Sequence, residues 1–232
     1  MGFQKTINQV LPVALEGDFA SANPRASMLV GDSALVTGSS GVTVGNFAWA
    51  TAAGVVTSAW AAACRIGFVH REMQALITTY LAEASLIIPG GLPVTLMTAG
   101  DFWDRFAGGA TVGQKVYAYY VDGSAYSGVT GTPPTNALIT ANIATNTTLT
   151  VTANTGANIV VGQPVSGAGI AAGAYISALG TGTGGAGTYT MSAAATATTT
   201  GITVTATTAV ETNFIVASTA AAGELAKTTI QG

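Results

Sequence analysis

The sequence predicts a mainly all-β protein, and three observations lead to this prediction. Thirty glycines among 232 residues, together with long stretches of Thr, Ala and Gly, indicate turns and extended strands and not a helical bundle. Several segments alternate polar and apolar residues with a period of two, which is typical of half-buried strands. Between Gly123 and Val210 the chain has no Asp, Glu, Lys, Arg or His, and so abrupt a change in composition marks a second module.

The expected architecture has three parts. Residues 1–27 are predicted to form an extended N-terminal arm, because they hold few strand signals and Pro24 disfavours helix in the residue before it. Residues 28–128 and 209–232 are predicted to form one discontinuous domain, a β-barrel or a β-sandwich-like fold. Residues 129–208 are predicted to form a second, small all-β domain that is inserted into the first.

Four segments carry the strand prediction for the discontinuous domain. Residues 42–49 alternate, with a bulge expected at Gly45. Residues 92–97 are a further candidate strand, and Pro93 indicates that it is an edge strand or that the strand starts there. Residues 116–121 run into Asp122-Gly123, a strong hairpin signal. Residues 213–216 supply a strand that would complete the same sheet after the insert.

The stretch 72–86 supports two interpretations. Its apolar residues fall at helical spacing, which predicts a short helix, whereas a pair of irregular strands fits the rest of the domain. The apolar positions concerned are Met73, Leu76, Ile77, Tyr80, Leu81 and Ala84.

Strand signals are strongest in the insert, whose leading linker is predicted at residues 131–134, a segment with two prolines. The clearest period-two segments are residues 148–153 and 202–206. Residues 180–187 are glycine-rich and are expected to form a loop tip, since they lack the Lys-Ser/Thr ending of a phosphate-binding loop. Three shorter strands are predicted between these segments, at 159–161, 174–176 and 188–191.

The residue types that catalysis and metal binding need are scarce. His70 is the single histidine and Cys64 the single cysteine, so neither a hydrolytic triad nor a zinc cluster nor an intrachain disulfide is expected. Asp101 and Asp104 are close in sequence, but a turn-making role is favoured over a catalytic carboxylate pair. We therefore expect no enzymatic activity and no cofactor or metal.

Charge and hydropathy argue against two further classes of protein. The net charge is −3 with only seven basic residues, which is too few for a protein that neutralises nucleic acid phosphates. The most apolar stretch, residues 47–64, is rich in alanine and interrupted by polar residues and glycine, unlike a membrane-spanning helix. No hydrophobic signal region follows the first residues. We expect neither a nucleic acid nor a membrane partner.

A series of short motifs resembles the tailed-phage structural cement proteins. The resemblance covers about residues 1–128 and 209–232, in order. The motifs lie at residues 17–25, 41–50, 67–71, 88–95, 100–103, 111–116, 211–214 and 223–227. The insert departs from this pattern, and its residues 161–170 and 180–189 resemble a glycine-rich β module of various phage structural proteins.

The resemblance implies a β-rich capsid decoration subunit without enzymatic activity. Such a subunit is made in the host cytoplasm and binds the outer capsid surface of the virion. Its expected partners are the major capsid protein and further copies of itself, as a homotrimer over capsomer junctions. The expected action is head stabilisation by bridging capsomers.

We expect the capsid contact in the N-terminal arm, by strand addition to an exposed edge. The arm is extended, bears a proline and has little capacity to form a core. The residues concerned are Asp18, Phe19, Asn23, Pro24 and Arg25.

A second hypothesis places aromatic residues at an oligomer interface, because such side chains are enriched there. Ordinary core packing is the alternative for each of them. The residues proposed for the interface are Trp49, Phe102, Trp103 and Tyr119.

Two other functions stay open at this level. The insert at 129–208 is an alternative adhesion module for a glycan or host surface, although Tyr175 and Tyr189 are its only aromatic residues for stacking on sugars. A tail-tube or fibre component is a further structural alternative.

Overall fold

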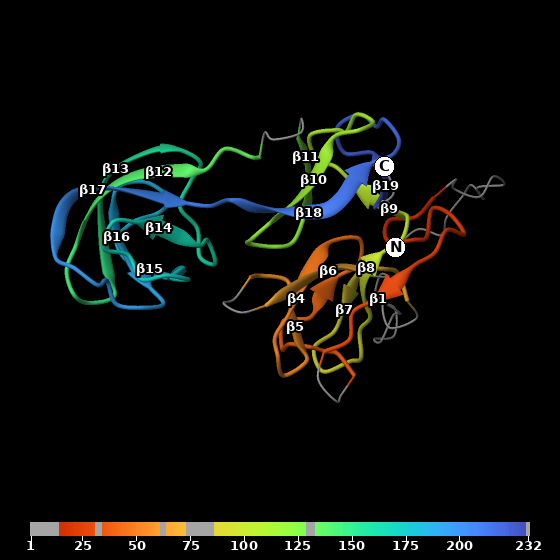
Figure 1. Ribbon diagram of the computed structural model, residues 1–232, viewed down its shortest axis with the longest axis horizontal. Coiled ribbons are helices and arrows are strands. Elements are labelled where there is room, and N and C mark those ends of the chain that lie inside the picture. Colours follow the sequence, from red (N-terminus) through yellow and green to blue (C-terminus); the bar gives the residue numbers. More distant parts are fainter. Residues whose placement is uncertain (1–13, 31–33, 61–63, 73–85, 129–132, 231–232) are drawn as a thin grey trace, which may run out of the picture.

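The computed structural model describes residues 14–30, 34–60, 64–72, 86–128 and 133–230 (Figure 1). Within these ranges the chain forms β-strands, turns and loops, without a helix. The predicted all-β fold is confirmed. Most of the ambiguous stretch 72–86, including all of its apolar positions from Met73 to Ala84, lies outside the described residues.

Two sheets pack face to face as a β-sandwich. The five-stranded sheet has the order β11-β10-β18-β19-β9, with bounds Ala125–Gly128, Lys115–Tyr119, Ala209–Val216, Leu225–Thr229 and Phe102–Arg105. The six-stranded sheet has the order β1-β8-β6-β4-β5-β2, with bounds Ala26–Ser27, Leu96–Ala99, Arg65–Val69, Phe47–Ala50, Val55–Thr57 and Val36–Thr37. β2 and β5 pair in parallel, and the other neighbours are antiparallel.

Phenylalanines fill the space between the two sheets. Phe47 and Phe68 of the six-stranded sheet and Phe102 and Phe214 of the five-stranded sheet belong to one buried cluster. The Phe68 and Phe102 ring centroids lie 4.6 Å apart. Buried aromatic rings contribute large apolar areas and favour tilted or edge-on contacts of this kind, so this cluster is the main apolar core of the sandwich.

The six-stranded sheet is buried on both faces. In β4, Phe47 and Trp49 point into the sandwich, whereas Ala48 and Ala50 point to the opposite side. There a two-stranded ribbon of β3 (Val42–Thr43) and β7 (Ile87–Ile88) covers the sheet and completes a second apolar cluster. In β4, therefore, the large side chains face the sandwich core and the small ones face the second cluster.

Two glycine turns fix how the sandwich strands connect. The strand predicted at 42–49 is split into β3 and β4 by a turn at Gly45, which has φ +85° and packs against the Glu16 side chain. The predicted Asp122-Gly123 turn follows β10, and Gly123 (φ +74°) accepts a 2.8 Å hydrogen bond from Phe47 N–H. A Cβ at Gly123 would overlap the Phe47 carbonyl, so the close approach requires glycine.

The remaining six strands form a closed barrel. Their order is β14-β17-β12-β13-β16-β15, with bounds Val165–Gly167, Thr199–Ala206, Ala137–Ile143, Thr148–Gly156, Gly187–Met191 and Ile176–Leu179. A bridge between Pro164 and Tyr175 joins the two outer strands. Hydrogen bonds of 2.9 Å from Val165 N–H to Ala174 O and from Ile176 N–H to Gln163 O complete the closure.

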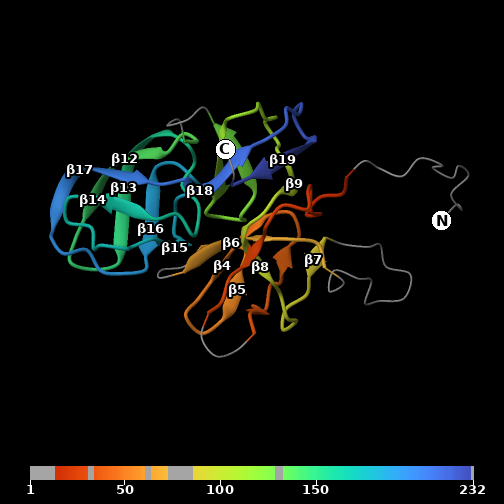
Figure 2. The same ribbon diagram turned by 45° about the vertical axis from the view of Figure 1, so that its right-hand side comes forward.

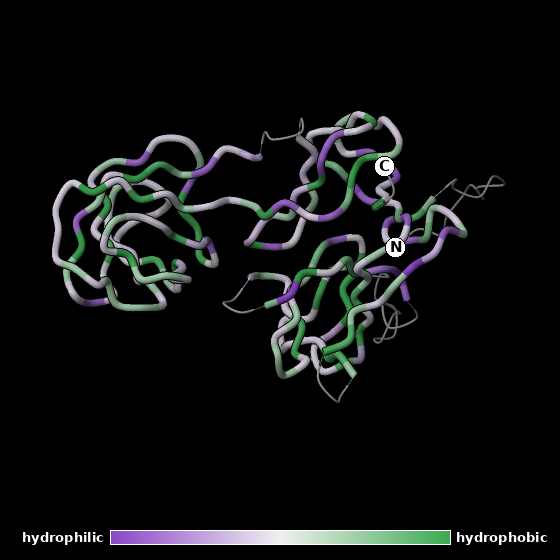
Figure 3. Tube along the Cα trace, in the orientation of Figure 1, coloured by the Kyte–Doolittle hydropathy of each residue, from purple (hydrophilic) through white to green (hydrophobic). Residues whose placement is uncertain are grey.

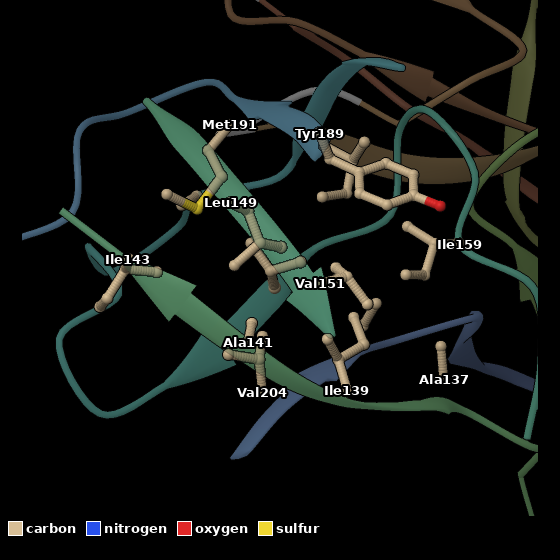
Figure 4. Close-up of a cluster of buried hydrophobic side chains, with 14 of the residues drawn as sticks. Ala137, Ile139, Ala141, Ile143, Leu149, Val151, Ile159, Tyr189, Met191 and Val204 are labelled. Carbon is tan, nitrogen blue, oxygen red and sulfur yellow. The ribbon is translucent and has the colours of Figure 1, made fainter. Parts of the chain in front are cut away.

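Small aliphatic side chains and one tyrosine fill the barrel. Figure 4 shows Ile139, Leu149, Val151 and Val204 pointing inward from β12, β13 and β17. Tyr189 closes one end and is 1% exposed, and its hydroxyl accepts from Gly184 N–H and donates to Gly185 O. The alternate residues of these strands face outward, which is the expected consequence of period-two sequences.

One extended run of chain joins the two bodies. β17 of the barrel is followed, after two residues, by β18 of the sandwich, and Figure 2 shows β17 leading into β18 along one path. The domain boundaries expected at 128/129 and 208/209 stay predictions, because residues 129–132 lie outside the described chain.

Candidate assembly surfaces

The described part of the predicted N-terminal arm lies along β9, an edge of the five-stranded sheet. Gly17 N–H donates to Trp103 O at 2.8 Å, Trp103 N–H to Asp18 O at 2.9 Å, and Ala20 N–H to Asp101 O at 2.8 Å. These bonds continue the antiparallel pattern of the sheet, with Phe19 bridged to Phe102. Residues 17–20 therefore add a short strand to the protein's own sheet.

Side-chain contacts anchor the same segment to the sandwich. The Phe19 ring lies 4.9 Å from the His70 ring and 5.4 Å from the Phe102 ring, measured between centroids. The Arg25 guanidinium carbon lies 3.9 Å from the Phe19 centroid, a cation–π geometry. Asp18 pairs with Arg71 at 3.2 Å. Asp18 and Phe19 thus hold the segment in place.

Beyond Ala20 the chain turns outward, and residues 21–27 are exposed. Asp101 ties this turn down by accepting hydrogen bonds from Ser21 Oγ at 2.5 Å and Asn23 Nδ2 at 2.6 Å. Partial burial raises the pKa of Asp101, but these bonds, with those from Thr229, outweigh it and the net pKa is lowered. Three of the predicted capsid-contact residues, Asn23, Pro24 and Arg25, are therefore presented on a fixed, exposed turn.

The four residues predicted for an oligomer interface divide into two pairs. Trp49 and Phe102 are 2% and 0% exposed and pack inside the sandwich core. Trp103 and Tyr119 are half-buried and point away from that core. An interface role stays a prediction, and only the second pair retains surface for it.

Trp103 and Tyr119 lie on the face of the five-stranded sheet that points away from the six-stranded sheet, here called the outer face. On it, Lys227 lies opposite Trp103, with Nζ 5.1 Å from the indole centroid. Tyr126 lies 5.9 Å from Tyr119. Lys115 pairs with Glu211 at 3.1 Å across β10 and β18. The outer face thus mixes aromatic rings with charges of both signs.

Sequence reasoning missed Tyr126, Lys115 and Lys227 as members of this face. Their only signal was period-two spacing in short strands, which shows that residues share a face but not which face is outward. Burial raises the pKa of Tyr119, with further contributions from Tyr126 and Asp122, so its hydroxyl remains protonated at neutral pH.

One acidic side chain is buried beside the anchored segment. Asp104 on β9 is 1% exposed, and neither carboxyl oxygen has a well-aligned hydrogen-bond partner among the described residues. Burial raises the pKa of Asp104 well above 3.8, and the Glu16 carboxylate raises it further, while the Arg105 backbone N–H opposes this only in part. Glu16 itself pairs with Arg105 at 2.7 Å.

The carboxyl groups of Asp101 and Asp104 lie in different environments. Asp101 is bound to Ser21 and Asn23 at the exposed turn, whereas Asp104 faces the interior. Among the residues that the structure describes, no group of three or more His, Cys, Asp or Glu side chains is arranged to hold a metal ion. Those residues also contain no helix long and apolar enough to cross a membrane.

A comparison with protein families now bears on what these surfaces are for. The model of a bacteriophage family, the XM1 gp53 minor capsid protein, matches residues 3–161, which is more than half of the chain. The chain belongs to this family. A search of curated proteins finds no match.

As a member of the XM1 gp53 minor capsid protein family, the protein is a structural component of a bacteriophage virion and associates with the capsid. The expectation of a phage structural protein is confirmed at this level. The matched range contains the sandwich strands from β1 to β11 and ends at residue 161, beyond β13, whereas β18 and β19 of the sandwich lie outside it. The family pattern therefore includes the first two strands of the barrel.

Proposed function

We propose that the protein is a capsid decoration, or cement, subunit that binds the outer surface of the phage head and bridges capsomers. Membership in a minor capsid protein family is the observation that carries this proposal. The exposed turn at 21–27 and the outer face offer two separate surfaces for contact. The proposed partners are the major capsid protein and the protein itself, as a homotrimer, and the proposed role involves no catalysis.

The physical action of such a subunit is differential binding. A protein that binds the assembled shell but not its separated pieces stabilises the shell by mass action. Contact with more than one capsid subunit adds avidity beyond that of a single interface. Pressure from packaged DNA separates capsomers, and a subunit that spans two of them opposes that movement.

Electron cryo-microscopy of the virion tests the proposal directly. We expect density for the sandwich and the barrel on the outside of the capsid shell, over the junctions between capsomers. Density confined to the tail tube, a tail fibre or the inside of the shell would refute a decoration role. Comparison of expanded and unexpanded heads would then show whether binding depends on the assembled state.

We propose that Asn23, Pro24 and Arg25 contact the major capsid protein, with Asp18 and Phe19 as their anchor. The first three are exposed on a turn that Asp101 holds, so little ordering is needed on binding. Charge reversal by Arg25→Glu is expected to weaken binding to expanded capsids by about tenfold or more. Arg65→Glu, at an exposed position on β6, is the matched control. Equal loss in both variants would show a general charge effect and contradict the proposal.

We propose that the outer face is the contact between copies in the trimer. The half-buried rings of Trp103, Tyr119 and Tyr126 are the side-chain types that interfaces favour. The double variant Trp103→Ala/Tyr126→Ala is expected to sediment as a monomer at micromolar concentration. Leu138→Ala removes an exposed apolar side chain from the barrel instead and is expected to leave the trimer intact. A double variant that remains trimeric would refute this interface.

The alternative of glycan or host adhesion through the insert receives no support from its aromatic residues. Tyr189 is buried in the barrel core, and Tyr175 packs edge-on against Trp60 at 5.5 Å. These are the two aromatic residues of the insert. The Tyr189 ring is therefore not available for stacking on a sugar, and the Tyr175 ring is already in contact with Trp60.

A further inference from the structure

The barrel and the sandwich meet at a cluster of aromatic side chains. Trp60, which follows β5, lies 5.4 Å from Tyr120, which follows β10, and 5.5 Å from Tyr175 of the barrel, both edge-on. Tyr120 in turn stacks against Trp49 at 6.2 Å, at the edge of the sandwich core. A continuous chain of rings therefore runs from the sandwich core to the barrel.

Tyr175 is placed for this contact and not for the barrel's own stability. Its neighbours Ala174 and Ile176 are buried in the barrel core, whereas Tyr175 points outward and is half-buried. The rest of the outward-facing wall is largely threonine and serine. The ring contact of this outward-pointing tyrosine is with Trp60 of the sandwich, at 5.5 Å between centroids.

The loop beside Tyr175 is shaped to lie against the same surface. A Cβ built on Gly162 would be 3.6 Å from Tyr120 O and 4.0 Å from Trp60 O, so the loop approaches the sandwich backbone closely. Gln163 is 1% exposed and holds this loop internally: its Oε1 accepts from Val160 N–H at 3.0 Å and its Nε2 donates to Asn158 O at 3.3 Å.

Backbone hydrogen bonds join the aromatic cluster to the connecting strands. Trp60 N–H donates to Tyr120 O at 2.8 Å, and Tyr120 N–H donates to Thr208 O at 3.1 Å. Thr208 also clamps the two connections together, since its N–H donates to Asn136 Oδ1 at 3.1 Å and its hydroxyl to Thr135 O at 2.8 Å. The two connecting segments and the aromatic contact thus meet at one place.

We propose that Trp60, Tyr120 and Tyr175 form a latch that fixes the barrel in one orientation on the sandwich. The latch makes one rigid body of the two domains, in addition to the run of chain that leads from β17 into β18. Two bodies at a fixed angle present their surfaces to a capsid without the entropy cost of orienting each separately. The inference concerns the isolated chain and does not depend on decoration being the function.

The variant Tyr175→Ala tests the latch in the full-length protein. Tyr175 is outside the barrel core, so the barrel itself is expected to fold normally. Hydrogen exchange at the Trp60 and Tyr120 amides should accelerate by roughly tenfold. Loss of an aromatic contact and its burial shifts the equilibrium between the closed and the open state of the latch by about that factor. Amides of Val116 and Ala118, inside β10, should be unchanged.

Two controls separate the latch from a general loss of stability. Tyr175→Phe keeps the ring and should behave as the unmodified protein. Leu138→Ala removes an exposed apolar side chain from the barrel wall and should leave the Trp60 and Tyr120 amides unaffected. Small-angle X-ray scattering should show a larger maximum dimension for Tyr175→Ala only. Unchanged exchange and scattering in Tyr175→Ala, or independent tumbling of the two domains in the unmodified protein, would overturn the proposal.

Discussion

The sandwich and the barrel are both built of β-strands, but their residue compositions differ. The sandwich carries charged side chains, with three ion pairs and a His70–Glu72 contact among its described residues, and a core rich in phenylalanine. The barrel carries no charged side chain, and its core is made of aliphatic side chains together with Tyr189 and Met191. In Figure 3 hydrophobic positions lie along the strands of both bodies.

The outer walls explain how the barrel does without charge. Its outward positions are mostly hydroxyl-bearing, and several pair across strands, as Thr148 does with Thr190 and Thr140 with Thr203. Such pairs contribute modestly to sheet stability and keep the wall hydrated. A surface without charge lacks the repulsion that keeps proteins apart, which suits a module that lies against neighbours in an assembly.

The largest effect expected from this comparison is in the sandwich core. Phe102 is fully buried and its ring meets Phe19, Phe68 and Phe214. Phe102→Ala should lower the free energy of unfolding by about 3–5 kcal/mol, because it removes a large side chain and leaves a cavity. Denaturant titration followed by tryptophan fluorescence reports this, since Trp49, Trp60 and Trp103 all lie in the sandwich.

The barrel should hardly respond to Phe102→Ala. Its core shares no residue with the sandwich cluster, so its amides should keep their hydrogen-exchange protection in the variant. Equal loss of protection at Leu149 and Val151 would show that the two bodies unfold as one unit. The sandwich and the barrel would then differ in the composition of their surfaces but would not be separate cooperative units of unfolding.

Strand prediction from the sequence succeeded where one face of a strand is buried and the other is polar. Residues 148–153 and 202–206 lie within β13 and β17 as expected. The strand predicted at 159–161 was wrong: Ile159 is buried in the barrel core but comes from a loop. A short apolar run signals burial, and burial does not require a ladder of hydrogen bonds.

The missed strand β12 shows the converse problem. Its inward residues include Ala137 and Ala141, while Leu138 is 52% exposed on the outside. Small side chains at inward positions and a large apolar side chain at an outward position weaken the alternation of apolar and polar residues by which a strand is recognised. The strand is defined instead by its pairing on both sides, with β13 and β17, which no local pattern reveals.

The candidate surfaces were predictable in part. The sequence pointed to residues 17–25 as an extended segment, but the anchoring of Phe19 on Phe102 depends on residues far apart in the chain. Likewise, Phe102 and Trp103 are neighbours whose opposite directions follow from strand geometry. Which of them faces the core is decided by the partner sheet, and hence only by the fold.

A smaller effect is expected from the buried Asp104, the feature of the sandwich with no counterpart in the uncharged barrel. Its folded-state pKa is raised, so its contribution to stability is fully present below the unfolded pKa near ~3.9 and is lost as pH rises through the folded value. Asp104→Asn removes this titration. The free energy of unfolding of the variant should therefore rise relative to that of the unmodified protein as pH rises above about 4.

The Asp104 measurement is a pair of denaturation curves at each pH, so that other titrating groups cancel in the difference. A gap between the two proteins that stays constant with pH would show that Asp104 ionises normally in the folded state. Asp101→Asn is the contrasting control: its lowered pKa means that its stabilising contribution is present above the unfolded pKa and lost as pH falls.

The smallest effect is expected on the barrel wall, where a charge can be added without touching the core. Thr203 is exposed on β17 and lies opposite Thr140. Thr203→Lys should change the free energy of unfolding by no more than about 0.5 kcal/mol, as surface substitutions usually do. That result would show that folding of the barrel does not require an uncharged wall. The lack of charge would then serve contacts in the assembly, and Thr203→Lys should weaken binding in a capsid-binding assay. A loss of stability well beyond that range would instead assign the threonine wall to the barrel's own cross-strand packing.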